Sequence, residues 1–177
     1  MRRFLDRLYA ASGALAALCL AAIAATMLLQ AALREAGVLL RGADDIVGWL
    51  CAASAFLALG YTFRKGELVR VGLLLEHLAP RARRRAEVLA LGAALLFAAY
   101  FLWAVSVFVY QSWRFGEVAQ GLIKLPIWIP QLSLALGAAI FFVAVLDEFV
   151  VLLRGGRPAY RSAEDEHRAH PEAGDMS

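Results

Sequence analysis

The side chains best suited to chemistry in this sequence are two adjacent carboxylates, Asp147 and Glu148, near the end of a long apolar stretch. An ionisable group inside a membrane span is costly and usually marks a path for ions or substrate. Two interpretations stay open for this pair. It lies at headgroup level with Arg154 and Arg157 as partners, or it forms a docking contact with basic groups on another membrane protein.

Known patterns of enzyme active sites are missing from the rest of the chain. The sequence contains no H-E-x-x-H, no P-loop, no G-x-S-x-G and no Cys–His cluster. His167 and His170 stand three residues apart in a charged C-terminal stretch, where solvation explains them better than metal binding. We therefore predict no catalytic residue, no metal site and no bound cofactor, and a function other than catalysis.

The elements that must position these side chains are predicted to be helices in a membrane. Of the 177 residues 62% are hydrophobic, and the mean hydropathy is +0.65. Four long runs contain no charged residue, namely 8–33, 46–63, 88–113 and 125–146. A helix of roughly 20 apolar residues crosses the hydrocarbon core of a bilayer, and it satisfies its own backbone hydrogen bonds there. Each run is long enough for one span.

We accordingly predict an all-α integral membrane protein with four transmembrane helices. A single membrane domain covers residues 1–154, with spans at about 8–33, 44–63, 88–112 and 128–153. Residues 155–177 are rich in charge, Pro and Gly, a composition typical of a disordered tail.

The distribution of basic residues predicts which side of the membrane each end faces. Lys and Arg in short loops favour the cytoplasmic side. The two terminal stretches and the loop between spans 2 and 3 hold all but four of the 18 Lys and Arg residues. Both termini are therefore predicted to be cytoplasmic. Pro126 and Trp128 then lie at the outer start of span 4, where Pro fits the first helical turn and Trp favours the interface.

The cytoplasmic loop contains the segment RKGELVRVGLLLEHLAPRARRR, residues 64–85. Four apolar residues recur in it at helical spacing: Leu68, Val71, Leu75 and Leu78. This stripe predicts a short amphipathic helix at 68–79 that lies in the inner membrane interface, with a plain loop as the alternative. No aromatic side chain interleaves with the basic ones to stack a base. The partner predicted for this segment is membrane lipid, and nucleic acid is excluded.

Two local patterns, together with the length and the number of spans, carry a family likeness. Span 2 starts near Asp45, ends in FLALG at 56–60, and is followed by RKGELVRVGLL, in which Arg70 and Val71 form an Arg-Val pair. Span 4 is preceded by LPIWIP at 125–130. Across roughly residues 5–153 the chain resembles the small membrane subunit of tripartite ATP-independent periplasmic (TRAP) transporters, the DctQ-like family.

The likeness is incomplete after span 2. The family typically has an acidic residue at the start of span 2, as Asp45 is here, and then a basic-Gly-x-His-Ile-Arg-Val-Asp-like stretch. Leu68 stands where the His is usual, and Gly72 stands where the Asp is usual. No role of those two polar groups is carried over to this chain.

The resemblance implies a division of labour in a bacterial inner membrane. A larger multi-span subunit would carry the substrate and sodium sites, so that the complex uses a sodium gradient. A periplasmic solute-binding protein would deliver the solute, often a carboxylate. The small subunit would brace the large one without catalysing a reaction. The residues that we expect at contacts with partners are Asp45, Arg70, Pro126, Trp128, Asp147 and Glu148.

Two other classes of function remain as alternatives. A self-sufficient four-span exporter of the small multidrug type needs a membrane-embedded Glu in span 1, and residues 8–33 contain none. A membrane enzyme or an assembly factor of another type is the remaining alternative. Co-purification with a much larger multi-span protein would separate the transporter subunit from both.

Overall fold

Four α-helices make up the structure, a computed structural model that describes residues 2–64 and 80–154. They are α1 (Arg2–Glu35), α2 (Ala43–Arg64), α4 (Pro80–Arg114) and α5 (Trp128–Leu153). All four are long and apolar enough to cross a membrane. Within the described ranges there is no β-strand, so the predicted all-α fold with four spans is confirmed. The helix predicted at 68–79 and the tail at 155–177 lie outside the described residues.

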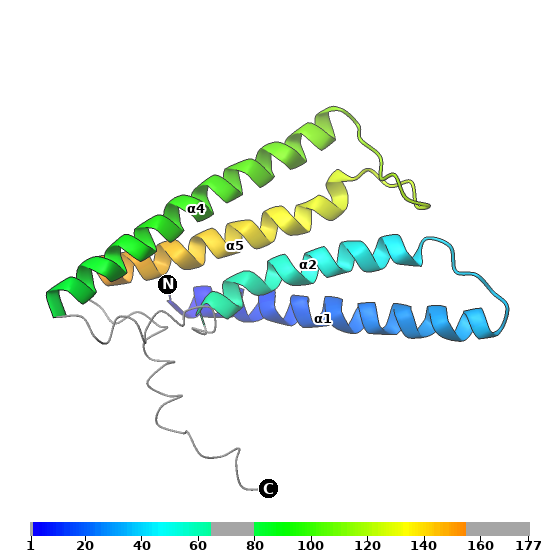
Figure 1. Cartoon of the computed structure of the whole chain (residues 1–177), viewed down its shortest axis with the longest axis horizontal. Coiled ribbons are helices and arrows are strands. Elements are labelled where there is room, and N and C mark those ends of the chain that lie inside the picture. The colour runs from blue at the N-terminus through cyan, green and yellow to red at the C-terminus, as the bar shows by residue number, and fades with distance from the viewer. Residues whose placement is uncertain (1, 65–79, 155–177) are drawn as a thin grey trace, which may run out of the picture.

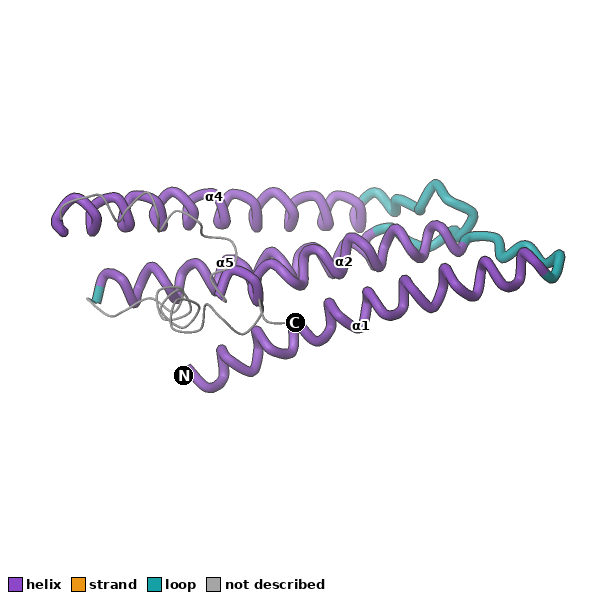
Figure 2. Tube along the Cα trace, turned by 60° about the horizontal axis from the view of Figure 1, so that its bottom comes forward, coloured by secondary structure: helices purple, strands orange, loops and turns teal. Residues whose placement is uncertain are grey.

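In space the helices follow the order α1, α2, α5, α4 (Figures 1 and 2). Helix α2 packs against α1 and α5, and α5 also packs against α4, so α2 and α5 form the centre of the bundle. The pairs α1–α2 and α4–α5 are antiparallel, whereas the central pair, α2 and α5, runs in the same direction. The bundle therefore consists of two helical hairpins that meet along their second helices.

The two ends of the bundle differ in composition. The start of α1 and the end of α5 lie at one end (Figure 1), which we call the basic end because Arg7, Arg84 and Arg154 belong to it. The other end, here the distal end, carries the loops 36–42 and 115–127. The cytoplasmic location of the basic end stays a prediction of the charge distribution.

Glycine allows the two central helices to approach closely. A Cβ atom added to Gly137 of α5 would lie 2.5 Å from the backbone oxygen of Phe56 in α2. A Cβ added to Gly60 of α2 would lie 2.7 Å from Cγ2 of Ile140 in α5. Small residues permit such close packing of helices in lipid, where van der Waals contact drives association. We call this contact, formed by Phe56, Gly60, Gly137 and Ile140, the central seam.

The serine and threonine hydroxyls of the described helices donate hydrogen bonds within the chain. The Ser12 hydroxyl of α1 donates to the backbone carbonyl of Leu57 in α2 and links the two helices. Other hydroxyls donate to a carbonyl on the preceding turn of their own helix, a common solution for Ser and Thr in apolar helices. These pairs are Thr26 to Ala22 (2.7 Å), Thr62 to Ala58 (3.0 Å), Ser106 to Leu102 (2.7 Å) and Ser133 to Pro130 (2.7 Å).

The distal ends of α1 and α4 are closed by the same backbone motif. Gly37 has a φ of 77° and Gly116 has a φ of 62°, a left-handed conformation that Gly adopts without strain. After α1, the Gly37 N–H donates to Arg34 and the Val38 N–H donates to Leu33. After α4, the Gly116 N–H donates to Trp113 and the Glu117 N–H donates to Ser112 in the same way. These are Schellman motifs, which satisfy the last carbonyls of a helix and turn the chain.

Candidate functional site

The loop between α4 and α5 is fastened to the start of α2 by Asp45. Oδ2 of Asp45 accepts hydrogen bonds from the backbone N–H of Leu122 at 2.7 Å and of Ile123 at 3.1 Å. Gly121 lies so close to Asp45 that a Cβ atom there would overlap the carboxylate. A Cβ on Gly42 would lie 2.6 Å from Cγ1 of Ile123. The loop is therefore in direct contact with the first turn of α2.

The sequence at the start of α2 explains why a carboxylate holds this loop. Asp44 and Asp45 both lie in the first turn of α2, where negative charge interacts favourably with the helix dipole. Oδ1 of Asp44 accepts a hydrogen bond from Nε2 of Gln30 in α1 at 3.3 Å. The two adjacent carboxylates thus bind different neighbours, one in α1 and the other in the α4–α5 loop. A contact of Asp45 with a partner protein stays a prediction.

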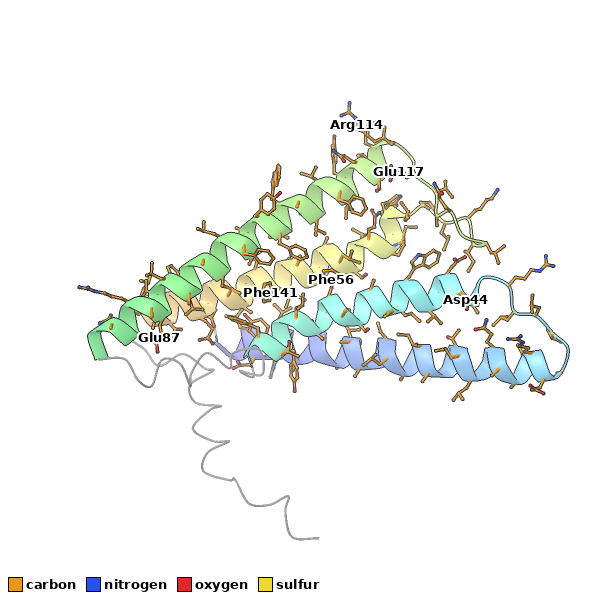
Figure 3. All side chains as sticks on the ribbon, in the orientation of Figure 1. Asp44, Phe56, Glu87, Arg114, Glu117 and Phe141 are labelled. Carbon is orange, nitrogen blue, oxygen red and sulfur yellow. The ribbon has the colours of Figure 1, made fainter. Side chains whose placement is uncertain are left out.

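The α4–α5 loop has a defined shape of its own. Its two arms exchange backbone hydrogen bonds, from Ala119 N–H to Leu125 at 2.9 Å and from Ile127 N–H to Glu117 at 3.0 Å. The Ser112 hydroxyl at the end of α4 donates to the Glu117 carboxylate at 2.8 Å. The loop is therefore a short closed turn (Figure 3 shows Glu117 and Asp44 at the distal end).

Pro126 and Trp128 stand where the loop enters α5. Pro126 forms the isolated antiparallel bridge with Val118, and its carbonyl accepts the Ile129 N–H at 3.1 Å. Trp128 is the first residue of α5 and is half-buried. Both residues lie at the start of the fourth helix, the position that the sequence predicts for them. Neither contact tests their predicted role toward a partner.

The distal end presents apolar side chains among charged ones. Three of the most exposed hydrophobic residues of the chain are here, namely Leu39, Phe115 and Leu122. Arg41 and Lys124 are exposed beside them in the same two loops. Exposed apolar groups with a polar rim mark surfaces that meet membrane or protein, and Asp45 fixes the position of one of the two loops.

The basic end places two carboxyl groups inside the bundle. Glu148 of α5 is only 4% exposed and Glu87 of α4 only 5%, while Asp147 is half-buried. A buried carboxylate is costly unless it is paired or hydrogen-bonded, and none of these three groups is without a partner. Glu148 therefore lies in the interior near the end of α5. Its docking role and that of Asp147 remain predictions, and Arg70 lies outside the described residues.

The middle of the bundle is filled by apolar packing. Its buried cluster draws on all four helices, with Ala16 of α1, Leu57 of α2, Ala98 of α4 and Val145 of α5 among its members. Within 2–64 and 80–154, no three His, Cys, Asp or Glu side chains come together as metal ligands.

Comparison with known protein families decides what kind of chain this is. The model of the family described as "Tripartite ATP-independent periplasmic transporters, DctQ component" matches residues 23–155. The match covers the last part of α1, all of α2, α4 and α5, and the distal loops. The chain belongs to the DctQ family. No curated protein matches the DctQ chain in a sequence search.

Membership defines the chain as the small component of a TRAP transporter and as a multi-pass membrane protein. The resemblance predicted from the sequence is thereby confirmed. The family is one of transporter subunits rather than enzymes. The structure also gives several residues of the family likeness a physical role, since Phe56, Gly60 and Gly137 form the central seam and Asp45 holds the distal loop.

Sequence reasoning missed two features of the DctQ chain. In the sequence Glu87 is only the charged residue before the uncharged run 88–113, yet in the structure it is buried. Its spacing of four from buried Leu91 was the available signal, because residues four apart share one face of a helix. The contact of Asp45 with Leu122 joins residues 77 positions apart, and no local pattern predicts such a distant pair.

Replacing Asp45 with alanine is expected to release the α4–α5 loop while the four helices stay intact. The variant removes Oδ2 of Asp45, the one acceptor that the Leu122 and Ile123 N–H groups share, and hydrogen bonds to a charged group contribute about 1.5–3 kcal/mol each when buried. Because these bonds are partly exposed, we expect a smaller effect, with amide exchange in residues 118–125 faster by roughly tenfold. Hydrogen exchange detected by mass spectrometry measures this change in exchange rate.

The matched control is Asp44→Ala, which removes the neighbouring carboxylate that binds Gln30 instead. Its effect on exchange in residues 118–125 should be small. If amide exchange in residues 118–125 became equally faster in both variants, the total negative charge at the start of α2, rather than the hydrogen bonds to Asp45, would hold the loop.

Proposed function

We propose that this chain is the small, non-catalytic membrane subunit of a TRAP-type secondary transporter in the bacterial inner membrane. It braces the large transport subunit, which performs ion-gradient-driven uptake of a solute. The observation that carries the proposal is the match to the DctQ component, which extends over residues 23–155. An uptake system of this class also includes a periplasmic solute-binding protein, and the solute we propose is a carboxylate.

The bracing role is supported by the make-up of the four helices. Transporter substrate sites usually use helices that are broken near mid-membrane, whereas α1, α2, α4 and α5 each run unbroken over their described length. No Asp, Glu, Lys, Arg or His lies within the runs 8–33, 46–63 and 88–113. We therefore assign the solute and sodium sites to the large subunit, and no cofactor to this chain.

The proposal is tested by co-purification and transport. A tagged chain, expressed with its neighbouring transporter genes, should bring down a much larger multi-span protein in mild detergent. Proteoliposomes with both membrane subunits and the binding protein should take up solute along a sodium gradient, and omission of the small subunit should abolish stable uptake. Recovery of the chain alone as a transport-active homodimer would refute the proposal.

The double variant Asp147→Asn with Glu148→Gln tests the non-catalytic part. It keeps side-chain size but removes both charges near the end of α5, so it should leave transport largely intact or weaken recovery of the complex. If the variant assembles normally and yet loses sodium- or proton-coupled transport, these carboxylates take part in coupling and the bracing role is wrong.

A further inference from the structure

The outward side of α4 carries a stripe of exposed side chains between Leu89 and Trp103. We call it the α4 face and define it by Leu89, Ala93, Leu96, Tyr100 and Trp103, which alternate at spacings of four and three. Such spacing keeps residues on one side of a helix and suits packing against a second helix. The opposite side of α4, with Leu91 and Ala98, packs against α5. The α4 face therefore points away from the bundle.

Tyr100 and Trp103 lie near the middle of the membrane. Tyr100 is sixteen residues after Arg84 and fourteen before Arg114, so about 24 Å and 21 Å of helix separate it from the two charged ends. Trp103 lies one turn further toward Arg114. With a hydrocarbon core of about 30 Å, both side chains fall inside the core. They are 65% and 62% exposed, and their rings contact each other with centroids 5.9 Å apart.

This depth is unusual for Tyr and Trp exposed on a membrane helix. Their rings favour the two interfaces, because one end is apolar and the other needs a hydrogen-bond partner. The other described Tyr and Trp residues follow the rule and lie nearer the helix ends: Tyr9, Trp49, Tyr61, Tyr110, Trp113 and Trp128. Within the described ranges, the Tyr100 hydroxyl and the Trp103 indole N–H have no hydrogen-bond partner. Lipid tails offer them none.

The exposed side of α1 provides the comparison. It is as open as the α4 face, with Leu18, Leu20 and Leu28 more than half exposed. However, the hydroxyl of Thr26, about two turns before Arg34 in α1, is bonded to the Ala22 carbonyl of the same helix. The α1 surface therefore suits lipid, whereas the α4 face contains polar groups that require acceptors from another protein.

The charges at the two ends of the stripe disfavour a second copy of this chain as the occupant. Arg85 lies four residues before Leu89 and Arg114 lies eleven residues after Trp103, so both are on the same side of α4 as the stripe, and both are exposed. Two copies with the same membrane orientation, joined by their α4 faces, would place like charges opposite each other at both ends, which is unfavourable. A different helix with an acceptor at mid-depth and acidic groups at its ends fits better.

We propose that the α4 face is the surface that binds the large membrane subunit, with Tyr100 and Trp103 donating hydrogen bonds to acceptors on that subunit at mid-membrane. This inference rests on the proposed function and specifies which helix the partner contacts. A chain of stacked rings runs from Phe97, which follows Leu96 of the face, to the centre of the bundle: Phe97 stacks on Phe101 and Phe101 stacks on Phe56 of α2, with centroids 6.1 and 5.8 Å apart. These stacked rings would connect the residues that contact the partner to the packed interior of the bundle.

Site-specific photocrosslinking in membranes that contain the whole transporter tests the surface. A photoreactive phenylalanine analogue at Leu96, in the α4 face, should cross-link to the large subunit. The same analogue at Leu18 of α1 should give lipid adducts or no protein product. Cross-links from Leu96 only to lipid, or to a second copy of this chain, would overturn the inference. So would cross-links to the large subunit from Leu18 but not from Leu96.

Substitution tests the hydrogen bonds separately from the fold. Tyr100→Phe removes a hydroxyl that has no acceptor among residues 2–64 and 80–154, so the thermal stability of the isolated subunit should not change. Recovery of the large subunit should fall roughly threefold to tenfold, the range of one or two hydrogen bonds between membrane helices. Leu20→Ala on α1 is the control and should have no effect. Unchanged recovery in both Tyr100→Phe and Trp103→Phe would contradict the assigned bonds.

The two proposals fail in different ways. If the unaltered tagged chain recovers no large subunit under any condition, the proposed function is wrong, and the inference fails with it. If the large subunit is recovered but the Leu96 probe and the Tyr100 variant show no involvement of α4, only the location of the interface is wrong.

Discussion

Replacing Gly137 with alanine is expected to separate α5 from α2 and to destabilise the whole bundle. The new Cβ would lie 2.5 Å from the Phe56 backbone oxygen and 2.6 Å from its carbonyl carbon, and backbone atoms cannot rotate away as a side chain can. Overpacking of this kind costs about 1–3 kcal/mol or more. The gain of about 1 kcal/mol from alanine's helix propensity offsets only part of it. Thermal unfolding of the subunit in detergent should show a clear loss of stability.

Gly48→Ala is the matched control for this substitution. Gly48 also lies inside a helix of the central pair, but nothing lies within 4 Å of the position a Cβ would take. The variant should be neutral or slightly more stable, because only the propensity gain remains. If Gly137→Ala were as stable as Gly48→Ala, the central seam would not depend on close approach of the two backbones.

Replacing Gly60 with alanine should also weaken the central seam, but this loss should be reversible. The added Cβ would meet Cγ2 of Ile140 at 2.7 Å, and the Ile140 backbone lies farther off at 3.5 Å. Ile140→Leu removes the Cγ2 methyl while it keeps the side-chain volume. The double variant Gly60→Ala with Ile140→Leu should therefore recover much of the lost thermal stability.

Ile140→Val serves as the control because valine retains a methyl at the position of Cγ2. The pair Gly60→Ala with Ile140→Val should stay as unstable as Gly60→Ala alone or become less stable. A double-mutant cycle over the four proteins gives the interaction energy, which for residues in contact is typically about 0.5–3 kcal/mol. A value near zero for the Leu pair would mean that the Ile140 side chain does not cause the loss.

The sequence predicted the helices well because the membrane imposes strong local constraints. Each expected span falls within one observed helix, and the fourth helix begins at Trp128, the residue expected to start it. The helices are longer than the uncharged runs, since Glu35, Arg64 and Arg114 continue them at their ends. A helix can continue beyond the hydrocarbon core into the headgroup region. The first charged residue therefore marks the end of the membrane span and not the end of the helix.

The arrangement of the helices could not be predicted in the same way. Small residues occur in all four spans, so the pattern alone did not indicate that Gly60 and Gly137 meet at one contact. The family likeness pointed to Asp45, but only the fold shows that its carboxylate reaches Leu122. In the sequence Tyr100 is one of several Tyr residues within the uncharged runs, and only its depth and exposure in the fold distinguish it. Each of these facts depends on which helices are neighbours.

The parallel pairing of α2 and α5 has a consequence for biosynthesis. A ribosome makes the chain from its N-terminus, so the α1–α2 hairpin enters the bilayer before α5 has been synthesised. The glycine surface of α2, with Gly60 at its contact with Ile140, must therefore remain exposed to lipid until the last helix emerges. The central seam and the contact between α4 and α5 both require α5, so they are the last contacts between the helices that can form, and the seam joins the first hairpin to the second.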